Sequence, residues 1–417
     1  MCKKWSSLSV CIALALACHG QTLVRSQTLL AGARQDPAVT LQGEHLDLVQ
    51  QANLRLPLIE QVSLRTETDR FQLQRQEYLS RLSINGLREI KQQNLLNAAE
   101  RLEIKSRQRL LLHEALANRY ATVVEYRLTQ LEAELQQRLA AVYEDKLRVL
   151  HKMAELDLDT DVEELIKVEY DRDELNLRLS GAQNRLKQLQ NLLLQHTPGL
   201  PADWQLDTAL FVQPLQLERL LALADPQDAL HPELDEQASK VSRLQAEYEL
   251  EKAKGEQVLD FLQLRFQNRP GEPFSREMSV GLGVNLPFKG SSRLKSNQLK
   301  IEQHEARQEL HLSQTNLQQK LAEASQTLNA LHQQYSQAQQ QVENSQALFS
   351  LRQAEAAAAG YDPLVLLRAQ ELLLKREMRR LDIGRDMYSQ YLDLLDWSGR
   401  LSAPPLRNYL SAGLEEY

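Results

Sequence analysis

The sequence has few residues that interrupt regular structure. Its 417 residues include only 15 glycines and 13 prolines, and aromatic residues make up 5% of the chain. Leucine, glutamine, alanine, glutamate, arginine and lysine dominate long stretches, and all of them favour helices. A doubly wound α/β enzyme would need many more loop signals, so the composition predicts a mainly α protein built from a few long helices.

Further absences exclude other classes of protein. The formal net charge is −7, so the chain has no basic excess for nucleic acid, and we expect no nucleic-acid partner. Beyond the N-terminal segment no apolar run reaches the roughly 18 residues of a membrane-spanning helix. No phosphate-binding glycine loop or nucleophile motif occurs, and the nine histidines are scattered. The alternating Asp157, Asp159 and Asp161 lack the glycine and distal glutamate of a calcium loop. We therefore expect no enzyme, no cofactor and no metal site.

The first 17 residues have the pattern of a secretory signal peptide. Two lysines precede an apolar stretch from 8 to 17, and Ala15 and Ala17 suit a cleavage site. Cys18 follows directly and is the only cysteine outside this segment, so the exported chain can form no internal disulfide. Cys18 is a candidate lipidation site, although Ala15 stands where a lipobox usually has leucine. The alternative is cleavage by the ordinary signal peptidase.

The rest of the chain divides into two unequal repeats. We expect an N-terminal extension over 18–40, repeats over 41–200 and 229–400, a linker over 201–228 and a C-terminal tail over 401–417. If Pro57 and Pro232 open the repeats, their offset is 175 positions, whereas the helix breaks at 157 and 360 are 203 positions apart. The first repeat would then lack about 28 residues. This difference predicts that the β-hairpin of the first repeat is truncated.

The second repeat contains a predicted β-hairpin over 258–288. Apolar side chains share one face of each strand, at Leu262, Leu264 and Phe266 on the first and Val280, Leu282, Val284 and Leu286 on the second. Strands of this length and alternation are typical of outer-membrane proteins, apolar toward lipid and polar toward the lumen. A half-buried hairpin of a soluble protein has the same pattern, so the hairpin alone leaves both interpretations open.

Heptad spacing predicts that long helices pair as antiparallel coiled coils. Apolar residues recur at intervals of 7, 3, 4, 3 and 4 at Leu321, Leu328, Leu331, Tyr335, Ala338 and Val342. A helix from 290 to 359 would be about 100 Å long, and the break at 360–363 would send the chain back along it. A soluble coiled-coil rod is the alternative that periodicity alone leaves open.

Three motifs resemble the TolC-like outer-membrane efflux proteins, and their order and spacing are more specific than any one of them. The segment 278–290 (MSVGLGVNLPFKG) is similar to the strand of the family's second repeat and the start of the helix that follows. The segment 359–370 (AGYDPLVLLRAQ) resembles the motif at the periplasmic helix tip. The segment 231–234 (HPEL) resembles the element that opens each repeat.

This resemblance implies a homotrimeric channel in the outer membrane of a Gram-negative bacterium, with a periplasmic extension. Each protomer would give strands to a shared barrel of about twelve strands and helices to a periplasmic α-barrel. The channel would be a passive conduit for solutes that an inner-membrane pump delivers through a periplasmic adaptor. The adaptor would contact the helix tips at Asp157, Asp159, Thr160, Gly360, Tyr361, Asp362 and Pro363. The truncated first hairpin favours an alternative, a periplasmic coiled-coil structural or adaptor-like protein of the same ancestry that forms no complete pore.

Overall fold

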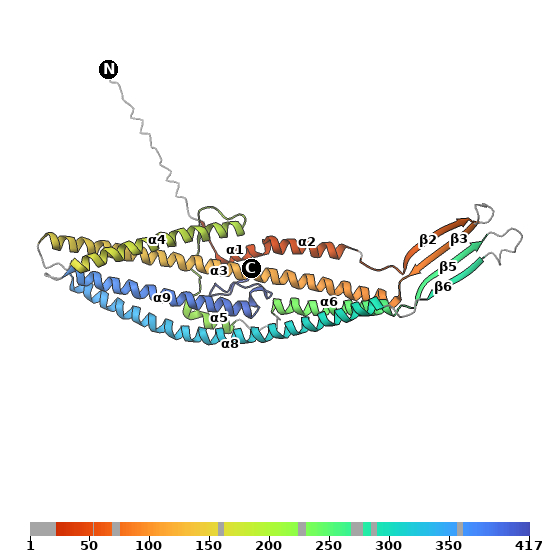
Figure 1. Ribbon diagram of the computed structural model, residues 1–417. Helices are drawn as coiled ribbons and strands as arrows, with labels where there is room; N and C mark the ends of the chain where they lie inside the picture. Colours follow the sequence, from red (N-terminus) through yellow and green to blue (C-terminus); the bar gives the residue numbers. More distant parts are fainter. Residues whose placement is uncertain are drawn as a thin grey trace, which may run out of the picture.

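The protein is an elongated, gently curved rod of helices with a small antiparallel sheet at one end (Figure 1). The computed structural model describes residues 22–417 except 53, 69–75, 157–161, 224–230, 268–277, 285–289 and 357–361. The first repeat contains α2 (Pro37–Gln51), β2 (Ile59–Thr68), β3 (Gln76–Ile84), α3 (Leu87–Glu155) and α4 (Val162–His196). The second contains α6 (Pro232–Gly255), β5 (Leu259–Gln267), β6 (Met278–Val284), α8 (Gly290–Glu355) and α9 (Pro363–Trp397). The short elements are β1 (Thr22–Val24), α1 (Ser26–Ala31), η1 (Gly32–Gln35), β4 (Trp204–Leu206), η4 (Pro214–Gln216), α5 (Leu217–Leu223) and η5 (Arg400–Ser402).

The two repeats have different landmarks from those predicted. Counterpart elements begin 195 to 203 positions apart, from 37 and 232 for α2 and α6 to 87 and 290 for α3 and α8. The predicted pairing of Pro57 with Pro232 is therefore wrong, because the counterpart of Pro232 is Pro37. Both prolines occupy the first turn of a helix, and the side chains of Asp36 and His231 cap these two helices. Pro57 instead precedes a strand.

The first repeat consequently has a complete hairpin, and the predicted truncation is wrong. β2 and β3 pair antiparallel from Ile59 opposite Ile84 to Thr68 opposite Gln76. The register shifts between Ile59 and Gln61. At this irregularity the sequence has two polar residues in succession, Glu60 and Gln61. They interrupt the apolar alternation that would have identified the strand from its sequence.

One four-stranded sheet joins the two hairpins in the order β2-β3-β5-β6. The helices follow a matching order, because α3 contacts α2 and α4 as well as α6 and α9, and α8 lies against α6 and α9. The chain is thus one curved layer. Its margins are β2 with α2 and α4 on one side, and β6 with α8 on the other.

The long helices pack along the predicted heptad seam. Leu328, Tyr335, Ala338 and Val342 are buried, and α8 extends over 66 residues, or about 99 Å. The predicted coiled-coil hairpins are therefore confirmed: α3 returns as α4, and α8 returns as α9. No helix in the described part of the chain combines the length and apolar character needed to cross a membrane.

Three segments outside the long helices form one packed unit at the middle of the rod, which we call the collar. It comprises residues 22–35, 204–217 and 400–417. β1 and β4 pair in parallel, and the Val212 N–H donates to the Leu410 carbonyl at 2.9 Å. Tyr120 of α3 donates its hydroxyl to the Arg407 carbonyl at 2.7 Å. The segments expected as an extension, a linker and a tail thus pack together and hold the two repeats in register.

Candidate functional site: the strand sheet and the helix tips

One face of the sheet is apolar across all four strands. The register aligns the rows Val62–Leu82–Leu262–Leu282 and Leu64–Ser80–Leu264–Val280, and it sets Phe266 opposite Met278 and Val284 opposite Leu259. The predicted hairpin residues therefore share this face, except Leu286, which lies outside the described residues. Leu64 is 80% exposed and Val280 is 74% exposed, so the described protomer leaves this face open. Sequence reasoning missed the apolar residues of β2 and β3 because it expected no complete first hairpin.

The opposite face of the sheet is polar and internally bonded. Arg265 pairs with Glu77, with 2.7 Å between Nη2 and Oε2. The Arg81 guanidinium lies 3.6 Å from the centroid of the Phe261 ring. This ring also covers Gly283, where an added Cβ would overlap it, so glycine allows the ring to lie close to β6. A sheet that is apolar on one face and polar on the other suits a boundary between lipid and water.

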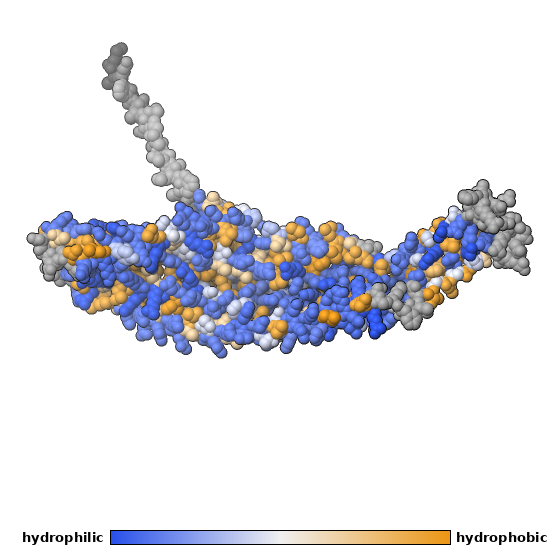
Figure 2. Space-filling model, in the orientation of Figure 1, coloured by the Kyte–Doolittle hydropathy of each residue, from blue (hydrophilic) through white to orange (hydrophobic). Residues whose placement is uncertain are grey.

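The two margins of the protomer are open. β2 and β6 each have an edge that pairs with no strand among the described residues. Exposed apolar residues follow the margin helices at Leu41 and Leu48 of α2, Val162, Ile166, Tyr170 and Leu177 of α4, and Leu294, Ile301 and Leu312 of α8. Figure 2 shows a largely hydrophilic helical surface on which such hydrophobic residues stand out, with others on the sheet at the right-hand end. Apolar stripes beside open strand edges are typical of surfaces that meet another chain.

The helix ends that flank the two predicted adaptor-contact turns lie at the end of the rod opposite the sheet (Figure 1). Five of the predicted contact residues lie outside the described chain: Asp157, Asp159, Thr160, Gly360 and Tyr361. Asp362 and Pro363 are described and exposed. The Asp362 carboxylate accepts the Leu364 N–H at 2.9 Å, and Pro363 occupies the first turn of α9. These two residues therefore fix where α9 begins.

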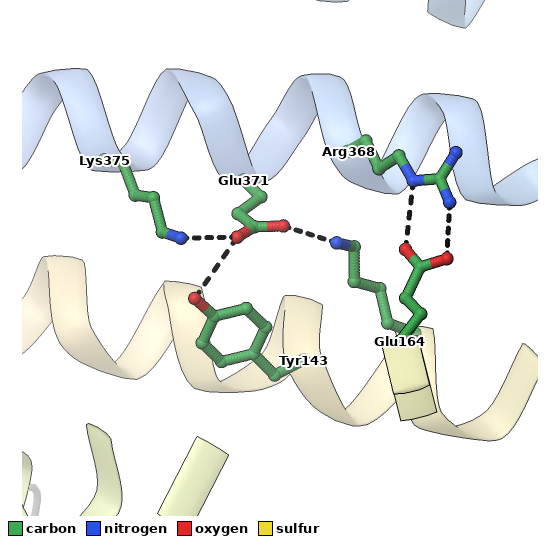
Figure 3. A network of polar contacts seen from close by, with 6 residues as sticks. Tyr143, Glu164, Arg368, Glu371 and Lys375 are labelled. Carbon is green, nitrogen blue, oxygen red and sulfur yellow. Dashed lines mark hydrogen bonds and ion pairs between the residues drawn. The ribbon is translucent and has the colours of Figure 1, made fainter. Parts of the chain in front are cut away.

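An ion pair joins α9 to α4 close behind the turns (Figure 3). Arg368 donates to both carboxylate oxygens of Glu164, from Nε at 3.1 Å and from Nη2 at 2.5 Å. Two parallel hydrogen bonds of this kind fix orientation as well as distance. The pair therefore ties the return helix of the second repeat to that of the first.

Glu371 is the centre of a buried cluster between α3 and α9 (Figure 3). Its carboxylate binds Lys146, binds Lys375 at 2.6 Å and accepts the Tyr143 hydroxyl at 3.3 Å. The side chains of Lys146 and Glu371 are only 5% and 15% exposed. Burial alone would raise the pKa of Glu371, but the hydrogen bonds from Lys146 and Lys375 outweigh it and hold this pKa below its usual value. Sequence reasoning did not select these residues, because single charges on a charge-rich helix are typical of a solvated face.

Two histidines join α3, α6 and α9 beside the collar. His113 bonds through Nε2 to the Asp396 carboxylate at 2.9 Å and through Nδ1 to Ser402 Oγ at 3.1 Å. The His231 Nε2 lies 3.0 Å from the Asp396 carbonyl oxygen, and its Nδ1 accepts the Glu233 N–H at 3.2 Å. His231 is therefore neutral with its proton on Nε2. Burial, and then the His113 ring 5.2 Å away, lower the pKa of His231. No group of three histidine, cysteine or acidic residues in the described chain could hold a metal ion.

This geometry predicts that acid weakens the start of α6. Because the pKa of His231 is lowered in the folded chain, its stabilising effect is complete above the unfolded value of about 6.5 and is lost as the pH falls toward the folded value. Protonation would also remove the Nδ1 acceptor that caps α6, a loss of about 1 kcal/mol. We expect amide exchange at 233–236, corrected for intrinsic rates, to accelerate between about pH 7.5 and about pH 5.5.

The variant His231→Asn is the control for this prediction. Asparagine caps helices well and does not titrate in this range, so the acceleration should disappear. Asp396 and Glu233, the carboxylates that face His231, remain unchanged in this variant. An equal acceleration in the variant would show that another group is responsible.

The rod with paired strand hairpins at one end and the ends of long helix pairs at the other has the fold of outer-membrane channels, as the sequence predicts. No protein-family description and no curated protein matches the sequence. Among solved structures, the chain is similar to CusC, studied for its transmembrane channel formation, with a TM-score of 0.64, 13% identity and coverage of 91% of this chain and 93% of CusC. It is similar to the outer membrane protein VceC of Vibrio cholerae, with a TM-score of 0.64, 13% identity and coverage of 90% and 96%. It is also similar to the open outer membrane channel MtrE of Neisseria gonorrhoeae, with a TM-score of 0.63, 14% identity and coverage of 90% and 89%. These neighbours are membrane channels and outer-membrane proteins rather than enzymes.

Proposed function

We propose that this chain is the outer-membrane channel of a tripartite efflux or export system, a passive conduit for solutes that a pump delivers through an adaptor. The observation that carries the proposal is the four-stranded sheet, apolar on one face and ion-paired on the other, with an open edge at each side. Three protomers with four strands each supply twelve strands. An even number of this size lies within the range of bacterial outer-membrane barrels.

Closure as a homotrimer would satisfy both margins of the protomer. β6 of one copy would pair with β2 of the next, because unpaired strand edges are not tolerated in the hydrocarbon core. The same rotation would bring α8 against α2 and α4 of the neighbouring copy. The exposed apolar stripes of those helices would then be covered, and the helices would continue the barrel as a periplasmic tube.

The complete first hairpin removes the reason for preferring a periplasmic protein without a full pore. That alternative required a first repeat with too few strands, whereas β2 and β3 are paired over their length. The proposed location is the outer membrane of a Gram-negative bacterium, reached through the predicted signal peptide at 1–17. This segment and Cys18 lie outside the described residues. Lipidation of Cys18 stays a prediction.

We assign the adaptor contact to the tip turns at 157–161 and 360–363. The support comes from the helices directly behind them, where the Arg368–Glu164 pair joins α9 to α4 and Glu371 joins α9 to α3. These links hold the starts of both return helices in a fixed relation. An adaptor would therefore meet helix ends that are already fixed relative to one another, which lowers the ordering cost of association.

Expression of the full-length chain in a Gram-negative host tests the channel proposal. We expect the protein in the outer-membrane fraction, as a trimer that resists detergent and dissociates on heating. The purified trimer should produce stepwise ion conductance in planar lipid bilayers. Recovery only from the soluble periplasm would contradict the proposal, and so would a membrane trimer without conductance.

A further inference from the structure

A cavity of about 370 Å³ lies where the collar meets the long helices. Its walls come from α3, α9 and collar residues 208–214, with Tyr335 of α8 at one side. Its volume falls within the range of small-molecule sites. α3 and α9 lie inside the helix order, and Tyr335 is buried, unlike the exposed apolar residues of α8 that form the margin.

The walls of this cavity are held in place before any ligand binds. The buried Tyr388 hydroxyl donates to the Val212 carbonyl, which fixes the collar against α9. The Tyr388 ring packs against Phe211 with centroids 5.9 Å apart. A Cβ at Gly384 would come within 3.3 Å of the Tyr335 ring, so glycine keeps this aromatic wall free of side-chain bulk.

Three arginines and two glutamates line the cavity, Arg127, Arg138 and Arg380 with Glu134 and Glu377, so its charges are incompletely matched. Arg138 pairs with Glu377 at 3.3 Å, and its side chain is 59% exposed. Arg127 donates to the neutral Gln130 side chain at 3.3 Å instead of to a carboxylate. Arg380 has no ion-pair partner among the described residues, and its charge opposes the rise in the pKa of the Tyr335 hydroxyl that burial causes.

Partial burial of an arginine charge without a close carboxylate is costly. Burial lowers the pKa of Arg127, and the attraction of Glu134 offsets only part of this effect. An anion placed between Arg127 and Arg380 would accept charge-assisted hydrogen bonds from two guanidinium groups that form no close ion pair among the described residues. The aromatic and leucine side chains around them favour a ligand with an apolar body.

We propose that this cavity binds a small aromatic carboxylate, with its ring against Tyr335 and its carboxylate between Arg127 and Arg380. Such a ligand would bridge α3, α9 and the collar, so its binding would stabilise their junction. The site is distinct from the conduit proposed above and does not depend on it. Either proposal can fail without the other.

The test compares a charged probe with its neutral counterpart on the purified full-length protein. Naphthalene-2-carboxylate and naphthalene-2-carboxamide differ in charge, so binding to detergent or to exposed apolar surface is common to both. We expect calorimetry to show binding of the carboxylate at least about ten-fold tighter than that of the amide. Equal affinities, or no binding of either probe, would overturn the proposal.

Three variants test whether the probes bind in this cavity. Arg380→Gln should reduce carboxylate affinity by about ten-fold or more and leave the amide nearly unchanged. Arg379→Gln is the matched control, because Arg379 is the neighbouring exposed arginine of α9 and lines a different groove. Gly384→Val should weaken both probes by adding bulk beside Tyr335. Unchanged carboxylate binding in Arg380→Gln and Gly384→Val would overturn the assignment, even if Arg127 variants fail to fold.

Discussion

Replacing Val62 with arginine is expected to prevent assembly in the outer membrane, whereas the same change at the adjacent Gln61 should be tolerated. Val62 lies on the apolar face of β2 opposite Leu82, and Gln61 lies on the polar face opposite Ser83. Successive strand residues point to opposite faces, so the two variants differ only in the side that receives the charge. A lipid-facing arginine near the bilayer midplane costs about 2–4 kcal/mol per copy, and a trimer would incur this cost in each copy.

The measurement is the fraction of each variant that reaches the outer membrane as a heat-modifiable trimer. Leu282→Arg on β6 provides an independent substitution on the same face and should fail as Val62→Arg does. Similar assembly of Val62→Arg and Gln61→Arg would show that the apolar face does not contact lipid. That outcome would contradict the proposed orientation of the sheet.

Replacing Glu371 with glutamine is expected to lower the local stability of α3 and α9, at the end of the rod opposite the sheet, by about 3 kcal/mol. The change leaves the Lys146 ammonium buried without its carboxylate partner, since its side chain is only 5% exposed. The double variant Lys146→Met with Glu371→Leu should recover much of this loss, because it removes both buried charges. Native-state hydrogen exchange over 143–150 and 368–378 reports this local stability.

Glu377→Gln is the matched control for the Glu371→Gln variant. Glu377 lies on the same helix as Glu371, but its partner Arg138 has a side chain that is 59% exposed. Glu377 is itself only 17% exposed, but the Arg138 charge that the substitution leaves unpaired stays in water, so we expect a loss of about 0–1 kcal/mol. If both glutamate variants changed the exchange rates equally, the buried cluster would have no special part in holding α9 to α3.

The Glu371 cluster also has a defined pH dependence. The folded pKa of Glu371 is lowered, so its contribution is fully present above the unfolded value of about 4.3. The contribution is lost as the pH falls through the lower folded value. Acid should therefore loosen α6 first, through His231, and the tip helices only at lower pH.

The two hairpins show what local sequence patterns can predict and what they cannot. The second was predicted because glycine and apolar residues alternate without interruption from Val280 to Val284. The first was missed because the irregularity at Ile59 and Gln61 interrupts the alternation, and polar residues outnumber apolar ones through β2. Once β2 is paired with β3, Val62 and Leu82 form a continuous apolar row with Leu262 of the second hairpin.

Local periodicity accounts for the helical rod and the second hairpin, because spacings of 3.5 and 2 residues depend only on sequence neighbours. Local turn residues such as Gly360 and Pro363 account for the predicted helix breaks. Tertiary packing alone accounts for the first hairpin, the collar and the Glu371 cluster. Tyr120 and Arg407 are bonded across 287 positions, and Lys146 and Glu371 across 225. Such contacts form only when particular helix faces meet, and no short sequence period specifies which faces those are.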